Sequence, residues 1–227
     1  MLGATPSASD GVALLVRTDE NVPVRAYHGP PAGYAEAGRV VLAGNRQLLL
    51  GMNVGALVLL LLCCAGTGTL FSAVRPELLT VEATFGSPGQ ALARLGPFAA
   101  GALVTPLLVI LVHEALHGAG FWWYTRARPT FGWNGWYAFA TAPGWCLTRG
   151  QMMVVGLAPL IVITLGGLVL ASSAPKPLAI LSILAVVVNA AGACGDLYLV
   201  GRLLRLPGAV LVEDQHDRIT WYLPAPT

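Results

Sequence analysis

Three ionisable side chains, His113, Glu114 and His117, stand within five residues of each other in an otherwise apolar stretch. Residues four apart lie on one face of a helix, so both imidazoles can turn toward one point. Histidines at this spacing bind Zn²⁺ in metallopeptidases, and the adjacent glutamate takes a proton from water. The triplet therefore predicts a zinc site with hydrolytic chemistry. The alternative is a buried helix whose polar side chains only bond one another, which suits a single histidine better than this triplet.

The composition is that of an integral membrane protein. Of the 227 residues, 56% are hydrophobic and 11% are charged, whereas a soluble domain carries about 25% charged residues. The net charge of +2 is too small to indicate nucleic-acid binding. The four cysteines form no Cys-x-x-Cys pair, and we expect them to be apolar packing residues. Cys194 is the one cysteine that we set apart from this expectation, because it lies two residues before Asp196.

Four apolar stretches are long enough to cross about 30 Å of hydrocarbon as helices. They fall at about residues 48–71, 97–123, 150–172 and 178–204. The second ends in aromatic residues followed by Arg126 and Arg128, a pattern typical of a membrane interface. We expect one four-helix transmembrane metallopeptidase-like domain over residues 47–205, with no cleaved signal peptide.

The fold class predicted from these spans is an all-α integral membrane protein with only small β elements. A β-hairpin is expected over about residues 129–140, because Asn134-Gly135 between aromatic runs favours a type I′ turn. The alternative there is an aromatic interfacial loop. Small β elements are also expected in the N-terminal arm (1–46), near 12–16 and 22–27, and in the C-terminal tail (206–227), near 209–212 and 219–223. His28 is expected in a loop, and His216 in a solvated turn.

The distribution of basic residues predicts the orientation in the membrane. Four spans put both termini on one side, which would then carry ten lysines and arginines, against three on the other side. The positive-inside rule therefore places both termini and the hairpin in the cytoplasm.

This topology predicts a third ligand. The second and fourth spans run in the same direction, so His113, His117 and Asp196 fall at a similar depth, roughly 10–15 Å below the cytoplasmic interface. An unpaired carboxylate there would cost several kcal/mol, and a metal ion would stabilise it. The alternative for Asp196 is a pairing with Arg202 or a backbone amide.

Asn189 lies two helical turns before Asp196, on nearly the same face. We expect it to donate a hydrogen bond to a substrate backbone or to a developing oxyanion. An interhelical hydrogen bond is an equal alternative.

Together these residues resemble the intramembrane site-2 proteases. More closely, they resemble a bacterial and archaeal family of small membrane proteins described as zincin peptidases. The closer resemblance rests on residues 113–118, 137–143, 157–159 and 189–197. It implies His113 and His117 as zinc ligands, Glu114 as general base and acid, and Asp196 as third ligand. Site-2 proteases usually have a proline within the Asn…Asp segment and a glycine after the aspartate, where this chain has Gly192 and Leu197.

The sequence thus predicts a zinc endopeptidase embedded in a prokaryotic plasma membrane. Its expected substrates are membrane or membrane-proximal proteins, hydrolysed near the cytoplasmic face, and its expected surroundings are the lipid bilayer. One alternative is a transporter of Zn²⁺ or protons, which should carry ionisable residues on several spans. The other is a membrane scaffold without activity, for which a base beside the ligands would serve no purpose.

Overall fold

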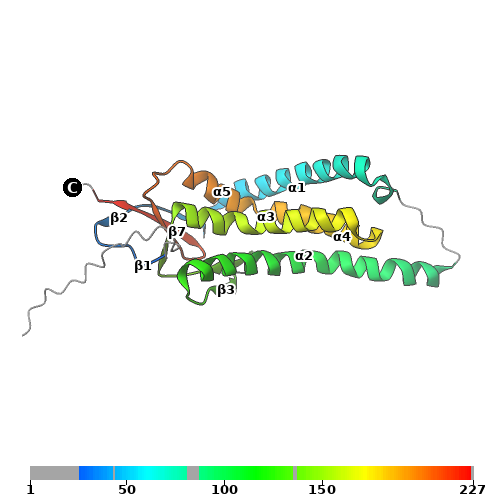
Figure 1. The fold of residues 1–227 in the computed structure, drawn as a ribbon, viewed down its shortest axis with the longest axis horizontal. Coiled ribbons are helices and arrows are strands. Elements are labelled where there is room, and N and C mark those ends of the chain that lie inside the picture. Colours follow the sequence, from blue (N-terminus) through cyan, green and yellow to red (C-terminus); the bar gives the residue numbers. More distant parts are fainter. Residues whose placement is uncertain (1–25, 43, 81–86, 135–136, 226–227) are drawn as a thin grey trace, which may run out of the picture.

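A bundle of helices forms most of the molecule (Figure 1). The computed structural model describes residues 26–225 apart from 43, 81–86 and 135–136, so the strand pair predicted near 12–16 and 22–27 lies almost entirely outside the described residues. Within these, the helices are α1 (Arg46–Val74), η1 (Pro76–Leu78, a 3-10 turn), α2 (Pro88–Thr125), α3 (Arg149–Ser173), α4 (Lys176–Gly192) and α5 (Cys194–Leu203).

Three of these helices, α1, α2 and α3, are each long and apolar enough to cross a membrane. Helices α4 and α5 pass the same test only as a pair, bent by 45° where they meet. The fourth predicted span, 178–204, is therefore a broken helix. Gly192 and Gly195 flank the break at Ala193, and glycine is a poor helix former. This break matters for the site because Asp196 follows it directly.

The all-α fold class is wrong, because two antiparallel sheets accompany the helices. The larger sheet has the order β1-β5-β6-β7-β2. Its strands are β1 (Tyr27–His28), β2 (Tyr34–Val41), β5 (Trp145–Thr148), β6 (Leu211–Asp214) and β7 (Arg218–Pro224). The arm and the tail therefore pair with each other, since β2 lies against β7. Apart from the hairpin of β6 and β7, the strands pair with partners far away in the sequence, so local patterns reveal little of these pairings.

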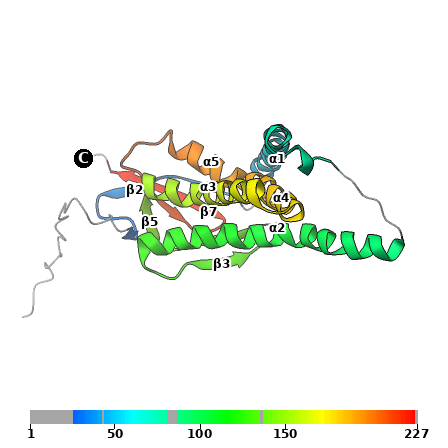
Figure 2. The ribbon, with the colours of Figure 1, turned by 45° about the vertical axis from the view of Figure 1, so that its right-hand side comes forward.

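The smaller sheet is the hairpin predicted after the second span. Its strands β3 (Thr130–Trp133) and β4 (Ala138–Thr141) pair in antiparallel register, Phe131 with Ala140 and Trp133 with Ala138. Their side-by-side arrangement with α2 is visible in Figure 2, where β3 runs along that helix. The hairpin predicted in the tail is present as β6 and β7.

The five-stranded sheet lies at one end of the bundle, where α5 and the ends of α2 and α3 meet (Figure 1). Its core residues pack against these helices, with Leu147 and Val212 fully buried, as is Val210 just before β6. Strand β5 leads directly into α3 through a capping box. In it, the Thr148 hydroxyl accepts from the Gln151 amide, and the Gln151 side chain accepts from the Thr148 amide. The sheet is thereby tied to the helix that contacts both α2 and α4.

Helices α3 and α4 approach closely at Gly167. A Cβ atom at this position would overlap Val186 Cγ2 and lie 3.4 Å from the Ser182 carbonyl oxygen. Val186 is 1% exposed, so it has no room to move away. The neighbouring Gly166 has no atom within 4 Å of an added Cβ. Small residues at such contacts let membrane helices pack backbone to backbone.

We expect Gly167→Ala to lower the free energy of unfolding by about 1–3 kcal/mol, because overpacking forces α3 and α4 apart. Gly166→Ala is the matched control, and it should be neutral or stabilising by up to about 1 kcal/mol because alanine favours the helix. Thermal unfolding of the detergent-solubilised protein measures both. Equal stability of the two variants would contradict the close contact.

Candidate metal centre

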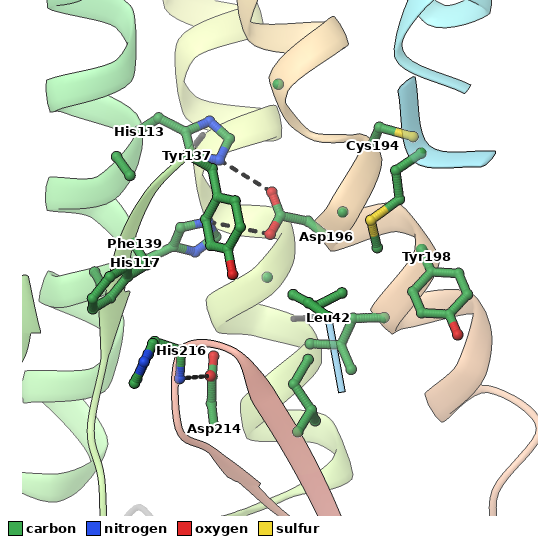
Figure 3. Close-up of a pocket in the computed structure, with 18 of the residues that line it drawn as sticks. Leu42, His113, His117, Tyr137, Phe139, Cys194, Asp196, Tyr198, Asp214 and His216 are labelled. Carbon is green, nitrogen blue, oxygen red and sulfur yellow. Dashed lines mark hydrogen bonds and ion pairs between the residues drawn. The ribbon is translucent and has the colours of Figure 1, made fainter. Parts of the chain in front are cut away.

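Two histidines of α2 and one aspartate of α5 converge at the sheet end of the bundle (Figure 3). His113 Nε2 lies 3.1 Å from Asp196 Oδ2, and His117 Nε2 lies 3.3 Å from Asp196 Oδ1. The candidate ligand atoms of all three residues lie within 4.8 Å of one another. Both histidines are buried. The structure therefore brings together the three residues that the sequence predicted as zinc ligands.

The other nitrogen of each imidazole has a partner that fixes the tautomer. His117 Nδ1 lies 2.9 Å from the Val155 carbonyl oxygen, which can only accept, so Nδ1 carries the proton. His113 Nδ1 lies 2.9 Å from Asn189 Oδ1. The Asn189 amide nitrogen faces the carbonyls of Pro159 and Leu160, at 3.3 and 3.5 Å, which fixes the amide orientation. Each ring therefore directs its Nε2 atom at the Asp196 carboxylate.

A contact of this kind is favourable when Nε2 carries a proton, and equally when a metal ion takes the place of the proton between the ring and the carboxylate. The two Nε2–Oδ separations of 3.1 and 3.3 Å fit zinc, because ligands about 2.0–2.1 Å from a tetrahedral ion lie about 3.3 Å from one another. Two imidazoles and a carboxylate are also a ligand set that catalytic zinc sites use, and outer hydrogen bonds to the histidine Nδ1 atoms are typical of them. The three residues thus fit a zinc ion with an open fourth position.

The local sequence explains why Asp196 lies beside the two histidines. The break between α4 and α5 places Asp196 in the first turn of α5. A carboxylate is stabilised there by the positive end of the helix dipole. An unbroken span would carry the same residue on a straight helix, without a helix N-terminus beside it.

Glu114 lines a cavity of about 520 Å³, and the three candidate ligands line the same cavity. The backbone amide of Ala140 on β4 interacts with its carboxyl group. The cavity is bordered by α1, α2, α3, α5, β4 and the turn between β6 and β7. Glu114 therefore lies beside the candidate ligands, where a general base could take a proton from water. The cavity in front of it has space for a substrate.

Asn189 is placed differently from the substrate-binding expectation. It is fully buried and does not line the cavity. Its side chain is committed to His113 and to two carbonyls of α3. The structure thus shows the interhelical hydrogen bond that was the alternative. Cys194 lines the cavity, but the cluster of three ligands does not include it.

Sequence reasoning missed three residues that line the cavity: Tyr137, Asp214 and His216. His216 was expected in a solvated turn, yet its imidazole stacks on Phe139 with ring centroids 4.7 Å apart. Its backbone has φ +55°, and its amide donates to Asp214 Oδ1 at 3.0 Å. Figure 3 shows the Asp214 carboxylate pointing toward the cluster. The sequence carries no signal for this, because it depends on how the tail pairs with the arm.

His28, expected in a loop, lies on strand β1. Its ring meets Trp145 edge to face. It does not line the cavity.

Burial raises the pKa of Asp214 from an ordinary 3.8 to about 6. The folded state then holds this proton more tightly than the unfolded state, so its stabilising effect is complete below pH 3.8 and is lost as the pH rises through about 6. In zinc-free protein, Asp214→Asn should remove up to about 3 kcal/mol of this pH dependence, while its Oδ1 still accepts from His216. Urea unfolding of both proteins at pH 4 and pH 7 measures the difference. The same pH dependence in both would contradict the burial of this carboxyl group.

We expect Asn189→Ala to weaken zinc binding about 10- to 100-fold, because His113 loses the acceptor that orients its ring. Ser182→Ala is the matched control. Ser182 is another buried polar residue of α4, and its hydroxyl bonds only to Leu178 within its own helix. Competition with a zinc chelator measures both affinities. An unchanged affinity in Asn189→Ala would show that the ring needs no such support.

Comparison with known proteins agrees with this geometry. Residues 106–211 match the model of a family described as "putative zincin peptidase". The resemblance to that family is thereby confirmed over these residues, and it supports a zinc metallopeptidase. Curated proteins and solved structures gave no match.

Proposed function

We propose that this chain, whose residues 106–211 match the zincin peptidase family, is a membrane-embedded zinc endopeptidase. The observation that carries the proposal is the convergence of two histidine Nε2 atoms on the Asp196 carboxylate, with Glu114 at the same cavity. A structural metal site needs ligands but no adjacent base. The cavity and Glu114 favour catalysis over a purely structural site.

In this mechanism His113, His117 and Asp196 hold the ion. Zinc supplies Lewis acidity, which polarises a carbonyl group and acidifies water. Glu114 then accepts a proton from the attacking water and later delivers it to the leaving amine. Asn189 and the Val155 carbonyl hold the two imidazoles in position through their Nδ1 atoms.

A peptide must be extended for its carbonyl to reach such a site, and β4 offers a surface for this. Within the described residues, β4 pairs as a strand only with β3. On its other edge the Ala140 amide meets Glu114, and the remaining backbone groups of that edge can bond an added strand. Residues 138–140 of β4 line the cavity. A substrate strand paired along this edge would pass in front of Glu114.

The proposed location is the cytoplasmic side of a prokaryotic plasma membrane. Three helices, or four spans if α4 and α5 count as one, are apolar and long enough to cross a bilayer. The excess of lysine and arginine on the side of the sheet supports a cytoplasmic orientation of that end. Membrane or membrane-proximal proteins are the substrates that this location favours.

The cavity lining argues against transport of Zn²⁺ or protons. Its lining residues from α1 and α3 include no ionisable side chain. A path across the membrane would need such residues on several spans.

Metal analysis combined with peptide cleavage tests the proposal. Wild type should bind one zinc ion and cleave unstructured peptides, with products identified by mass spectrometry. Glu114→Gln should keep zinc and lose about 10²- to 10⁴-fold in rate, because it removes the proton acceptor. His113→Ala should lose both zinc and activity, and Asp196→Ala should bind zinc more weakly. Wild-type protein without zinc, or an active Glu114→Gln, would refute the mechanism.

A further inference from the structure

Pro159 lies inside α3 and is fully buried. In an α-helix, the amide of residue 159 would donate to the carbonyl of residue 155, four positions earlier. Proline has no amide hydrogen, so this bond is missing and the Val155 carbonyl lacks its helical donor. A buried carbonyl without a partner costs free energy, so another donor is expected.

That donor comes from the metal centre. His117 Nδ1 lies 2.9 Å from the Val155 carbonyl oxygen. Val155 is 1% exposed, so the histidine fills the position in a region shielded from solvent. We infer that Pro159 is a positioning residue for the zinc site, because its missing amide hydrogen leaves the Val155 carbonyl free to orient His117.

The same turn of α3 also supports the other histidine. The carbonyls of Pro159 and Leu160 accept from the Asn189 side chain, whose oxygen faces His113. One interrupted turn of α3 therefore orients both imidazoles, one directly and one through Asn189. This gives the proline a role beyond the kink that prolines commonly produce in membrane helices.

Two substitutions separate the missing hydrogen bond from the shape of the ring. Pro159→Ala restores the amide hydrogen, which then competes with His117 for the Val155 carbonyl. Replacement of Pro159 by lactic acid, the α-hydroxy acid counterpart of alanine, removes the ring but leaves no amide hydrogen. Pro97→Ala is the control, because Pro97 also lies inside a long apolar helix but more than four turns before His113.

We expect Pro159→Ala to weaken zinc binding about 10-fold in a chelator competition assay, at the low end of the range for outer hydrogen bonds to metal ligands. The lactic acid variant should bind zinc like wild type, and so should Pro97→Ala. Circular dichroism and gel filtration in detergent confirm that each variant is folded. Unchanged zinc affinity in Pro159→Ala, or an equally weak lactic acid variant, would overturn the inference.

A second readout requires neither zinc nor peptidase activity. In metal-free protein labelled with ¹⁵N-histidine, the His117 Nδ1 proton should be protected from exchange in wild type and in the lactic acid variant. It should exchange faster in Pro159→Ala. Because the inference concerns ring orientation, this result stands even if the protein cleaves no peptide. Equal exchange in all three proteins would show that Pro159 acts only on helix shape.

Discussion

The structure of the site depends on one contact, the Asp196 carboxylate facing the Nε2 atoms of two imidazoles. A carboxylate in this position is stabilised by a cation, either a proton on the rings or a metal ion between them. Each histidine turns its Nε2 atom to Asp196 because its Nδ1 atom faces a fixed acceptor, Val155 on one ring and Asn189 on the other. The break between α4 and α5 then brings the carboxylate to the same point. The ligands are thus held by α2 and α5, and they are oriented by α3 and α4.

The site belongs to the helices and the sheet together. The cluster lies at the end of the bundle, and the surrounding cavity includes β4 and the turn between β6 and β7. Thr141 at the end of β4 donates to the Asp214 carbonyl oxygen, which joins the two hairpins beside the cavity. His216 stacks on Phe139 across the same boundary. The helices form most of the cavity wall, and the strands and turns of the two sheets complete it.

The sequence was most informative where a pattern is local. Spacing alone identified His113, Glu114 and His117, and the parallel direction of two spans brought Asp196 to them. The hairpin after α2 followed from Asn134-Gly135, and the apolar runs predicted the long helices. The five-stranded sheet could not be predicted in the same way, because β2 and β7 lie at opposite ends of the chain and each is stable only when paired. The positions of Asp214 and His216 depend on that pairing, so they were missed as well.

The pairing of β2 with β7 has a consequence for how the protein matures. The metal ligands lie on segments that are synthesised before the tail, and the helices can enter the membrane as they leave the ribosome. The part of the cavity lined by Asp214, His216 and Ile219, by contrast, forms only when residues 211–224 pair with the arm. During synthesis the ligands therefore exist without a complete substrate surface. The order of translation itself therefore delays completion of the cavity until residues 211–224 have been synthesised.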